Sequence, residues 1–410
     1  MATMPRRDAY RGPAILSYGF RPFFLASALY AALAVLLWLP MFFGELGTLS
    51  AFAPRDWHIH EMLYGYLPAV MTGFLFTAIP NWTGRLPVRG GPLLGLFALW
   101  LVGRIAVSTS AVIGWGPAAV IDCAFMVLVV TVAAREIVAG KSWRNLRVLV
   151  LISTLAVGNI LFHLQAHFVG TAEHGTRLGI AVAVLLLSVI GGRIVPSFTH
   201  NWLEQASPGR LPVAFGRFDM IVLLVSAAAL LLWVAVPTGP VAGICLLAAG
   251  ALHLARLARW AGDRTFGNRI VLILHVGYAF VPVGFLLMGA SAFDLFSPTA
   301  GFHAWAGGAI GVMTIAVMTR ASLGHTGRRL EASFATQAIY AGVVVAALAR
   351  ICAALHPAWS MLLLHVAAFA WVAAFLGFAA GFGPLLVGAP PSPGAVNRAC
   401  SPAHQGIGSR

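Results

Sequence analysis

Charged residues are scarce in this sequence. Asp, Glu, Lys and Arg make up 9% of the 410 residues, whereas hydrophobic residues make up 60%. A soluble globular protein carries roughly 25% charged residues. The composition excludes a soluble globular domain, because a core of that size would not bury so much apolar surface, and it indicates that lipid surrounds most of the chain.

Cysteine is also scarce, and its spacing excludes several kinds of metal site. The four residues, Cys123, Cys245, Cys352 and Cys400, are scattered and form neither a CxxC nor a CxxCH motif. This pattern argues against iron–sulfur clusters, c-type haem and a disulfide scaffold. A redox centre in this protein would therefore use ligands other than cysteine.

Long apolar runs fill the chain, and the alternating pattern of a β-barrel is absent. Each run is about as long as the 20 residues that cross a bilayer as a helix. The runs cover residues 22–43, 59–80, 91–109, 116–138, 146–168, 176–197, 217–236, 240–260, 268–290, 302–320, 335–355 and 359–383. We expect an all-α polytopic membrane bundle of twelve helices, with Pro196 ending or kinking the sixth. Residues 1–387 would form one domain, and residues 388–410 a disordered tail rich in Pro, Gly, Ser and Ala.

The net charge of +14 comes from basic residues in alternate gaps between the runs. The gaps on one side hold Arg6, Arg7, Arg11, Arg85, Arg89, Lys141, Arg144, Arg147, Arg210, Arg217, Arg259, Arg264, Arg269, Arg328 and Arg329. By the positive-inside rule this side is cytoplasmic, together with both termini. His253, beside the basic end of the eighth run, is expected at the interface. The basic residues form no continuous patch, so we expect the lipid bilayer, and not nucleic acid, as a partner.

Two segments of the chain resemble each other. Residues 60–85 align without a gap on residues 303–328, which places His60 on His303 and Gly65 on Gly308 and brings the two Thr-Gly-Arg endings together. The end of the sixth run also resembles the end of the second. Internal repeats are common in polytopic folds, and this one predicts a pseudo-threefold arrangement of three four-helix units.

Several histidines fall at a similar depth, near the outer ends of their runs. The candidate metal ligands are His58, His60, His163, His167, His303 and His365. His163 and His167 are four residues apart and share a helix face. Neutral imidazole is the commonest metal ligand, and it suits copper or haem iron. The alternative for each histidine is a hydrogen bond between helices, because a polar group in lipid must be satisfied.

A few charged residues lie inside the runs and need partners. Arg104, Arg350 and Asp122 fall in the outer third of their helices. Either Arg104 pairs with Asp122, or Arg104 or Arg350 binds a haem propionate, since Arg pairs bidentately with carboxylates. Glu61 would relay protons or orient the imidazole of His60. Its alternative role is that of a carboxylate favoured by the helix dipole.

Five motifs together resemble the NnrS family. They are YGFRPFF (18–24), WHIHEMLYGY (57–66), GFLFTAIPNWTGR (73–85), GGRIVPSFT (191–199) and VMTRASLGHTGR (317–328). The likeness extends from Tyr18 to about residue 383. It implies a multi-pass protein of the bacterial inner membrane that carries haem and copper and is linked to nitric oxide (NO) metabolism, denitrification and resistance to nitrosative stress.

The expected three groups of four helices also resemble haem–copper oxidases and respiratory NO reductases. The seventh run, residues 217–236, contains no histidine, whereas those enzymes carry an adjacent pair there. Any relation between this chain and those enzymes therefore concerns only the arrangement of helices. Function does not follow from fold alone.

The residues and the resemblance together give one main functional hypothesis. The protein would use haem b and copper to bind NO and reduce it to nitrous oxide, with electrons from a donor that the sequence does not identify. His60, His163, His303, His365, Arg104 and Arg350 would bind the cofactors, and Glu61 would deliver protons. The alternatives are a non-catalytic haem protein that senses or sequesters NO, and a metal or anion transporter.

Overall fold

The computed structural model describes residues 10–206 and 208–389. Within these residues the chain forms helices and connecting loops and no strand, and twelve helices are long and apolar enough to cross a membrane. The prediction of twelve spanning helices is confirmed. The disordered tail predicted for residues 388–410 lies almost entirely outside the described residues.

Nine of the spans are single helices. These are α1 (Phe20–Phe42), α4 (Gly91–Ser108), α6 (Trp115–Ala139), α7 (Leu146–Phe168), α8 (Glu173–Ala206), α9 (Arg217–Ala235), α10 (Pro240–Ala258), α11 (Arg269–Ser291) and α14 (Phe334–Leu355). The last span is α15 (Ser360–Val387), which a short 3₁₀ turn precedes. Pro196 does not end the sixth span, because α8 continues beyond it to Ala206.

Two spans are composite helices with a π-helical segment inside them. The second span joins α2 (Pro54–His60), η2 (Glu61–Tyr66) and α3 (Leu67–Thr83). The tenth joins α12 (Thr299–His303), η5 (Ala304–Val312) and α13 (Met313–His325). π-Helical segments are rare and occur mostly at functional sites. Here each one begins directly after one member of the His60–His303 pair, so the internal repeat extends to backbone conformation.

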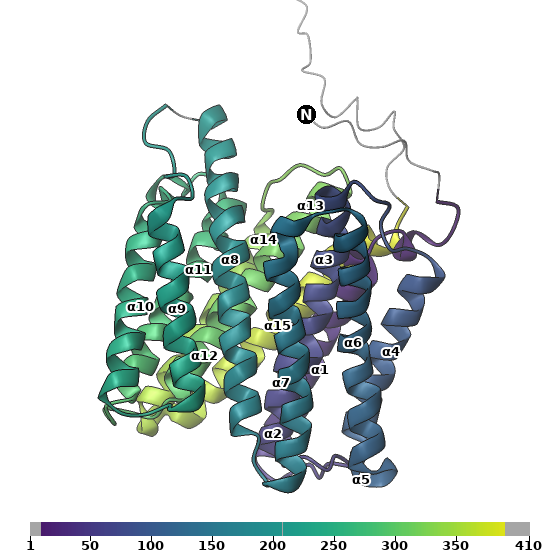
Figure 1. Cartoon of the computed structure of the whole chain (residues 1–410), viewed down its shortest axis with the longest axis vertical. Coiled ribbons are helices and arrows are strands. Elements are labelled where there is room, and N and C mark those ends of the chain that lie inside the picture. The colour runs from purple at the N-terminus through teal and green to yellow at the C-terminus, as the bar shows by residue number, and fades with distance from the viewer. Residues whose placement is uncertain (1–9, 207, 390–410) are drawn as a thin grey trace, which may run out of the picture.

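The helices form two lateral groups around a central one. Figure 1 shows α9, α10 and α11 on one side and α4 and α6 on the other, with α1, α3, α7, α8, α14 and α15 between them. The side chains that point outward are apolar, as lipid requires; examples are Val150, Leu224, Leu231, Val241 and Ile244. The pseudo-threefold arrangement stays a prediction.

The two ends of the described chain meet at one face of the bundle. Arg21, in the first turn of α1, is buried and donates hydrogen bonds to the backbone oxygens of Leu386 (2.9 Å) and Gly388 (2.7 Å) at the end of α15. The start of α1 and the end of α15 therefore lie at the same face, as an even number of crossings requires.

α11 and η5 approach each other closely in the centre of the bundle. The indole of Trp305 is fully buried and lies directly over Gly284, with its Nε1 donating to the backbone oxygen of Val281 (3.1 Å). We expect Gly284→Ala to destabilise the protein by about 1–3 kcal/mol, because the added methyl group displaces the indole. Thermal unfolding of the variant and the wild type in detergent measures this loss of stability.

Gly95→Ala is the matched control, because Gly95 lies on the exposed side of α4 and a Cβ there meets no other atom within 4 Å. A Gly284→Ala protein as stable as Gly95→Ala would contradict the assignment of this contact.

Candidate metal centre

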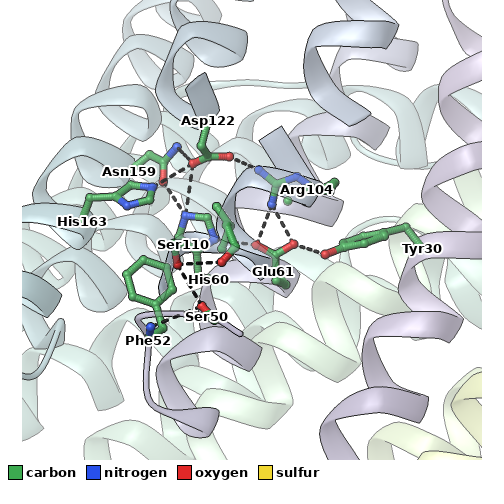
Figure 2. Close-up of polar contacts among 12 residues, drawn as sticks. Tyr30, Ser50, Phe52, His60, Glu61, Arg104, Ser110, Asp122, Asn159 and His163 are labelled. Atoms are coloured by element: carbon green, nitrogen blue, oxygen red, sulfur yellow. Dashed lines mark hydrogen bonds and ion pairs between the residues drawn. The ribbon is translucent and has the colours of Figure 1, made fainter. Parts of the chain in front are cut away.

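A buried network of polar side chains occupies one end of the bundle, between α1, α2, α4, α6 and α7. It contains Tyr30, His60, Glu61, Arg104, Asp122, Asn159 and His163, and Figure 2 shows these side chains pointing toward one another. All but Tyr30 are between 0% and 4% exposed. Burying so many polar groups in a membrane is unfavourable unless they form hydrogen bonds and ion pairs with one another.

Asp122 is the centre of this network. Its carboxylate pairs with the Arg104 guanidinium and accepts a hydrogen bond from Asn159 Nδ2 (2.8 Å). The same carboxylate lies 3.0 Å from His163 Nε2 and 3.2 Å from His60 Nε2. One carboxylate thus connects α4, α6, α7 and the start of the second span.

Glu61 forms the other half of the network. Both of its carboxylate oxygens lie 2.8 Å from Arg104 Nη1, and the Tyr30 hydroxyl donates to it. Glu61 Oε1 also lies 2.8 Å from His60 Nδ1. The carboxylate is therefore placed to orient the imidazole of His60, one of the two roles predicted for it.

The π-helical segment explains how neighbouring residues reach the same network. Successive side chains of an α-helix point about 100° apart, and a wider π turn changes this spacing. Gly65 in the same segment lets the Arg104 guanidinium lie against the helix backbone, because a Cβ at that position would meet Arg104 and the Glu61 carboxylate. Trp100, one turn before Arg104, donates to the Gly65 oxygen (2.9 Å) and fixes the approach of α4.

The charges within the network do not cancel. With both carboxylates ionised and the histidines neutral, Glu61, Asp122 and Arg104 together carry a net charge of −1. Both ring nitrogens of His60 face acceptor oxygens, at 2.8 Å from Glu61 and 3.0 Å from Asn159 Oδ1. An unbalanced charge in lipid is costly, so the cluster is suited to hold one more positive charge, which is either a proton or a metal cation.

Three members of the network are placed as a metal-binding group. One ligand atom each from His60, Asp122 and His163 lies within 4.8 Å of the other two, and all three side chains are buried. Two imidazoles and one carboxylate are ligands that suit copper, zinc or iron. Histidine ligands in metal sites are normally held by a second hydrogen bond. Glu61 provides such a bond to Nδ1 of His60, so the ligating nitrogen would be Nε2, which lies 3.2 Å from Asp122.

The comparison with protein families agrees with the sequence motifs. The family model described as NnrS protein matches residues 14–389, which is nearly the whole chain. The chain belongs to the NnrS family. A comparison with curated proteins gives no match.

The remaining predicted ligands of this NnrS-family protein lie elsewhere. His167 is outside the metal-binding group and stacks on Trp115, with ring centroids 3.9 Å apart. His58 stacks on Trp38 (4.3 Å), and its buried Nδ1 has no hydrogen-bond partner among the described residues. His303 interacts electrostatically with His58 and with Arg350.

His303 and His365 share one arrangement. Nδ1 of His303 donates to the Thr299 oxygen and Nδ1 of His365 to the Met361 oxygen, both at 2.8 Å. Each bond leaves the Nε2 lone pair available, which is the state of a metal-ligating imidazole. The His365 ring also stacks on Phe43 (5.4 Å).

Some members of the network gave no sequence signal. Asn159 precedes His163 by four residues and therefore shares its helix face, but an isolated Asn in an apolar run indicates little by itself. Tyr30 likewise follows no pattern. Asp122 and Arg104 were expected as an ion pair, and the structure places them so.

A second buried network, formed by side chains of α9, α10 and α11, corrects the prediction for His253. His253 is fully buried, with its ring nitrogens 2.9 Å from the hydroxyls of Ser226 and Tyr278. Arg256, one turn on, pairs with Asp219 (2.9 Å) and donates to the Tyr278 hydroxyl. His253 is thus part of an interhelical network and does not lie at the interface, because these partners satisfy it within the bundle.

Proposed function

We propose that this NnrS-family protein holds a copper ion between His60, Asp122 and His163 and uses it to bind NO and reduce it to nitrous oxide. The observation that carries the proposal is the buried His–Asp–His group, whose ligand atoms lie within 4.8 Å of one another. The family, which is linked to nitric oxide, supplies the substrate class. We place the protein in the bacterial inner membrane with cytoplasmic termini, from the distribution of Lys and Arg.

The residues present fit a copper ion. Imidazole and carboxylate ligands suit Cu(II), and the net charge of the cluster favours a cation. Bound copper would hold NO and accept electrons from a donor that the chain does not identify. Two molecules of NO, two electrons and two protons would give one molecule of nitrous oxide and one of water.

The protein's own side chains would position the site and supply protons. Glu61 holds Nδ1 of His60 at 2.8 Å, and Nε2, which lies 3.0 Å from Asn159 Oδ1, would bind the metal in place of that contact. Arg104 holds both carboxylates. The Tyr30 hydroxyl, which is half-buried, and the Glu61 carboxylate form a polar connection along which a proton would reach His60.

Two further histidines fit haem b by the chemistry of their donor atoms. His303 and His365 have Nε2 available as an iron ligand, because each Nδ1 is bonded to a backbone oxygen. Arg350, which interacts electrostatically with His303, would pair with a propionate. His58, with its unpartnered Nδ1, is a further candidate ligand.

The purified protein tests these assignments through its metal content and optical spectrum. We expect about one copper ion per chain, and a Soret band with α and β bands after dithionite reduction. Added NO should shift these bands or the copper signal in electron paramagnetic resonance. Nitrous oxide formed with an artificial electron donor would distinguish reduction from sensing or sequestration, and folded protein without metal after supply of haem and copper would favour a transporter.

A further inference from the structure

An apolar cavity lies in the middle of the bundle, on the inner side of the metal-binding network. Its walls come from α3, α7, α8 and α13, and it has a volume of about 80 Å³. Its lining is apolar almost throughout; Leu67, Val70, Ile152, Ala183 and Met313 are among the lining residues. A cavity lined in this way stays free of water and takes up small apolar molecules.

The cavity lies close to the metal-binding network along two helices. On the second span, Leu67 follows directly on the π-helical segment Glu61–Tyr66, whose first residue is Glu61. On α7, Ile152 precedes Asn159 by seven residues, which is about 10 Å. The inner end of the network and the outer end of the cavity are thus separated by about two helical turns along α7.

The cavity is open on one side. Met71, Phe74, Leu187, Ile190 and Val317 line it and are only half-buried, whereas Leu67, Ile152 and Ala183 on the opposite walls are buried. Because these residues belong to the middle of their spans, the opening faces the hydrocarbon core of the bilayer. Small apolar gases concentrate in this part of a membrane, for the same reason that apolar solutes leave water.

We infer that this cavity is a binding site for small apolar gas molecules, through which NO enters from the bilayer toward the metal centre. The inference rests on the proposed function for the identity of the gas. The volume suits a few diatomic molecules, and the almost wholly apolar lining offers no partner to a polar ligand. Buried side chains enclose the network itself. An apolar path lets NO move from the bilayer to the metal centre without a loss of favourable solvation.

Xenon and NO test the inference separately. Crystals of the full-length protein under xenon pressure should show xenon in the cavity, and Ile152→Phe, which fills it from α7, should remove that xenon. In stopped-flow measurements Ile152→Phe should slow NO association by about fivefold or more, as expected when an entry path is obstructed. The amount of NO bound at equilibrium and the metal content should stay unchanged.

Two further variants make the result unambiguous. Val150→Phe adds the same ring to the lipid-facing side of α7 and should leave both xenon and NO association unchanged. Ala183→Leu fills the cavity from α8 and should act as Ile152→Phe does, in case the latter folds poorly. Absence of xenon, an acyl chain in the cavity, or an unchanged NO association rate in both filled variants would overturn the inference. A wild-type protein that binds xenon there but no NO would instead overturn the proposed function.

Discussion

His163→Ala is expected to remove the metal ion from the purified protein. His163 is one of three ligands in the buried group with His60 and Asp122. Loss of a hydrogen-bond partner of a ligand already weakens metal binding by about 10–100-fold, so loss of the ligand itself should weaken binding by at least about 100-fold. Copper per chain, measured by atomic absorption after dialysis, should fall from about one to near zero.

His167→Ala is the matched control for this experiment. It lies on the same helix, four residues later, and stacks on Trp115 away from the network. It should retain the copper content of the wild type. Asp122 keeps Arg104 and Asn159 as partners in His163→Ala, so that variant should fold. Copper loss in His167→Ala, or full copper in His163→Ala, would contradict the assigned site.

Arg104→Met is expected to destabilise the protein by about 3–5 kcal/mol, because it leaves a buried ion pair without its cation. Arg104 contacts both Glu61 and Asp122. Its removal changes the net charge of the network from −1 to −2 with neutral histidines, inside lipid. Thermal unfolding in detergent, with metal removed by a chelator, measures the effect.

Removing one of the two carboxylate charges that lose Arg104 as a partner should restore stability. Arg104→Met combined with Glu61→Gln returns the network to −1, and we expect it to recover a large part of the loss. Arg329→Met is the control, since Arg329 and Glu331 form an exposed pair with side chains 80% and 64% accessible, and it should change stability by less than about 0.5 kcal/mol. Equal stability of Arg104→Met and Arg329→Met would show that the buried carboxylates do not depend on Arg104.

The candidate site was only partly predictable from the sequence. His60 and His163 stood out because histidine is rare and costly inside apolar runs, and Arg104 and Asp122 for the same reason. The i, i+4 spacing of His163 and His167 predicted a shared helix face, but only His163 belongs to the metal-binding group. Four residues advance a helix by about 6 Å, and α6 brings Asp122 to His163 while Trp115 meets His167.

Other parts of the site depend on contacts between distant segments. Asn159 and Tyr30 join the network from α7 and α1, and neither spacing nor composition marks them. His58 and His60 are two residues apart in sequence, yet one stacks on Trp38 and the other hydrogen-bonds to Glu61 and Asn159. The π turns after His60 and His303 likewise follow from packing, because local propensity does not favour them.

The sequence by itself determined that this is a membrane protein of the NnrS family with twelve spanning helices, because the thickness of the bilayer fixes the length of each apolar run and the family motifs are local strings. Only the tertiary structure decided which polar residues meet. A buried side chain in lipid must find its partner on another helix, and which helix face turns toward which neighbour depends on the packing of the whole bundle. His60, Asp122 and His163 became one site for that reason.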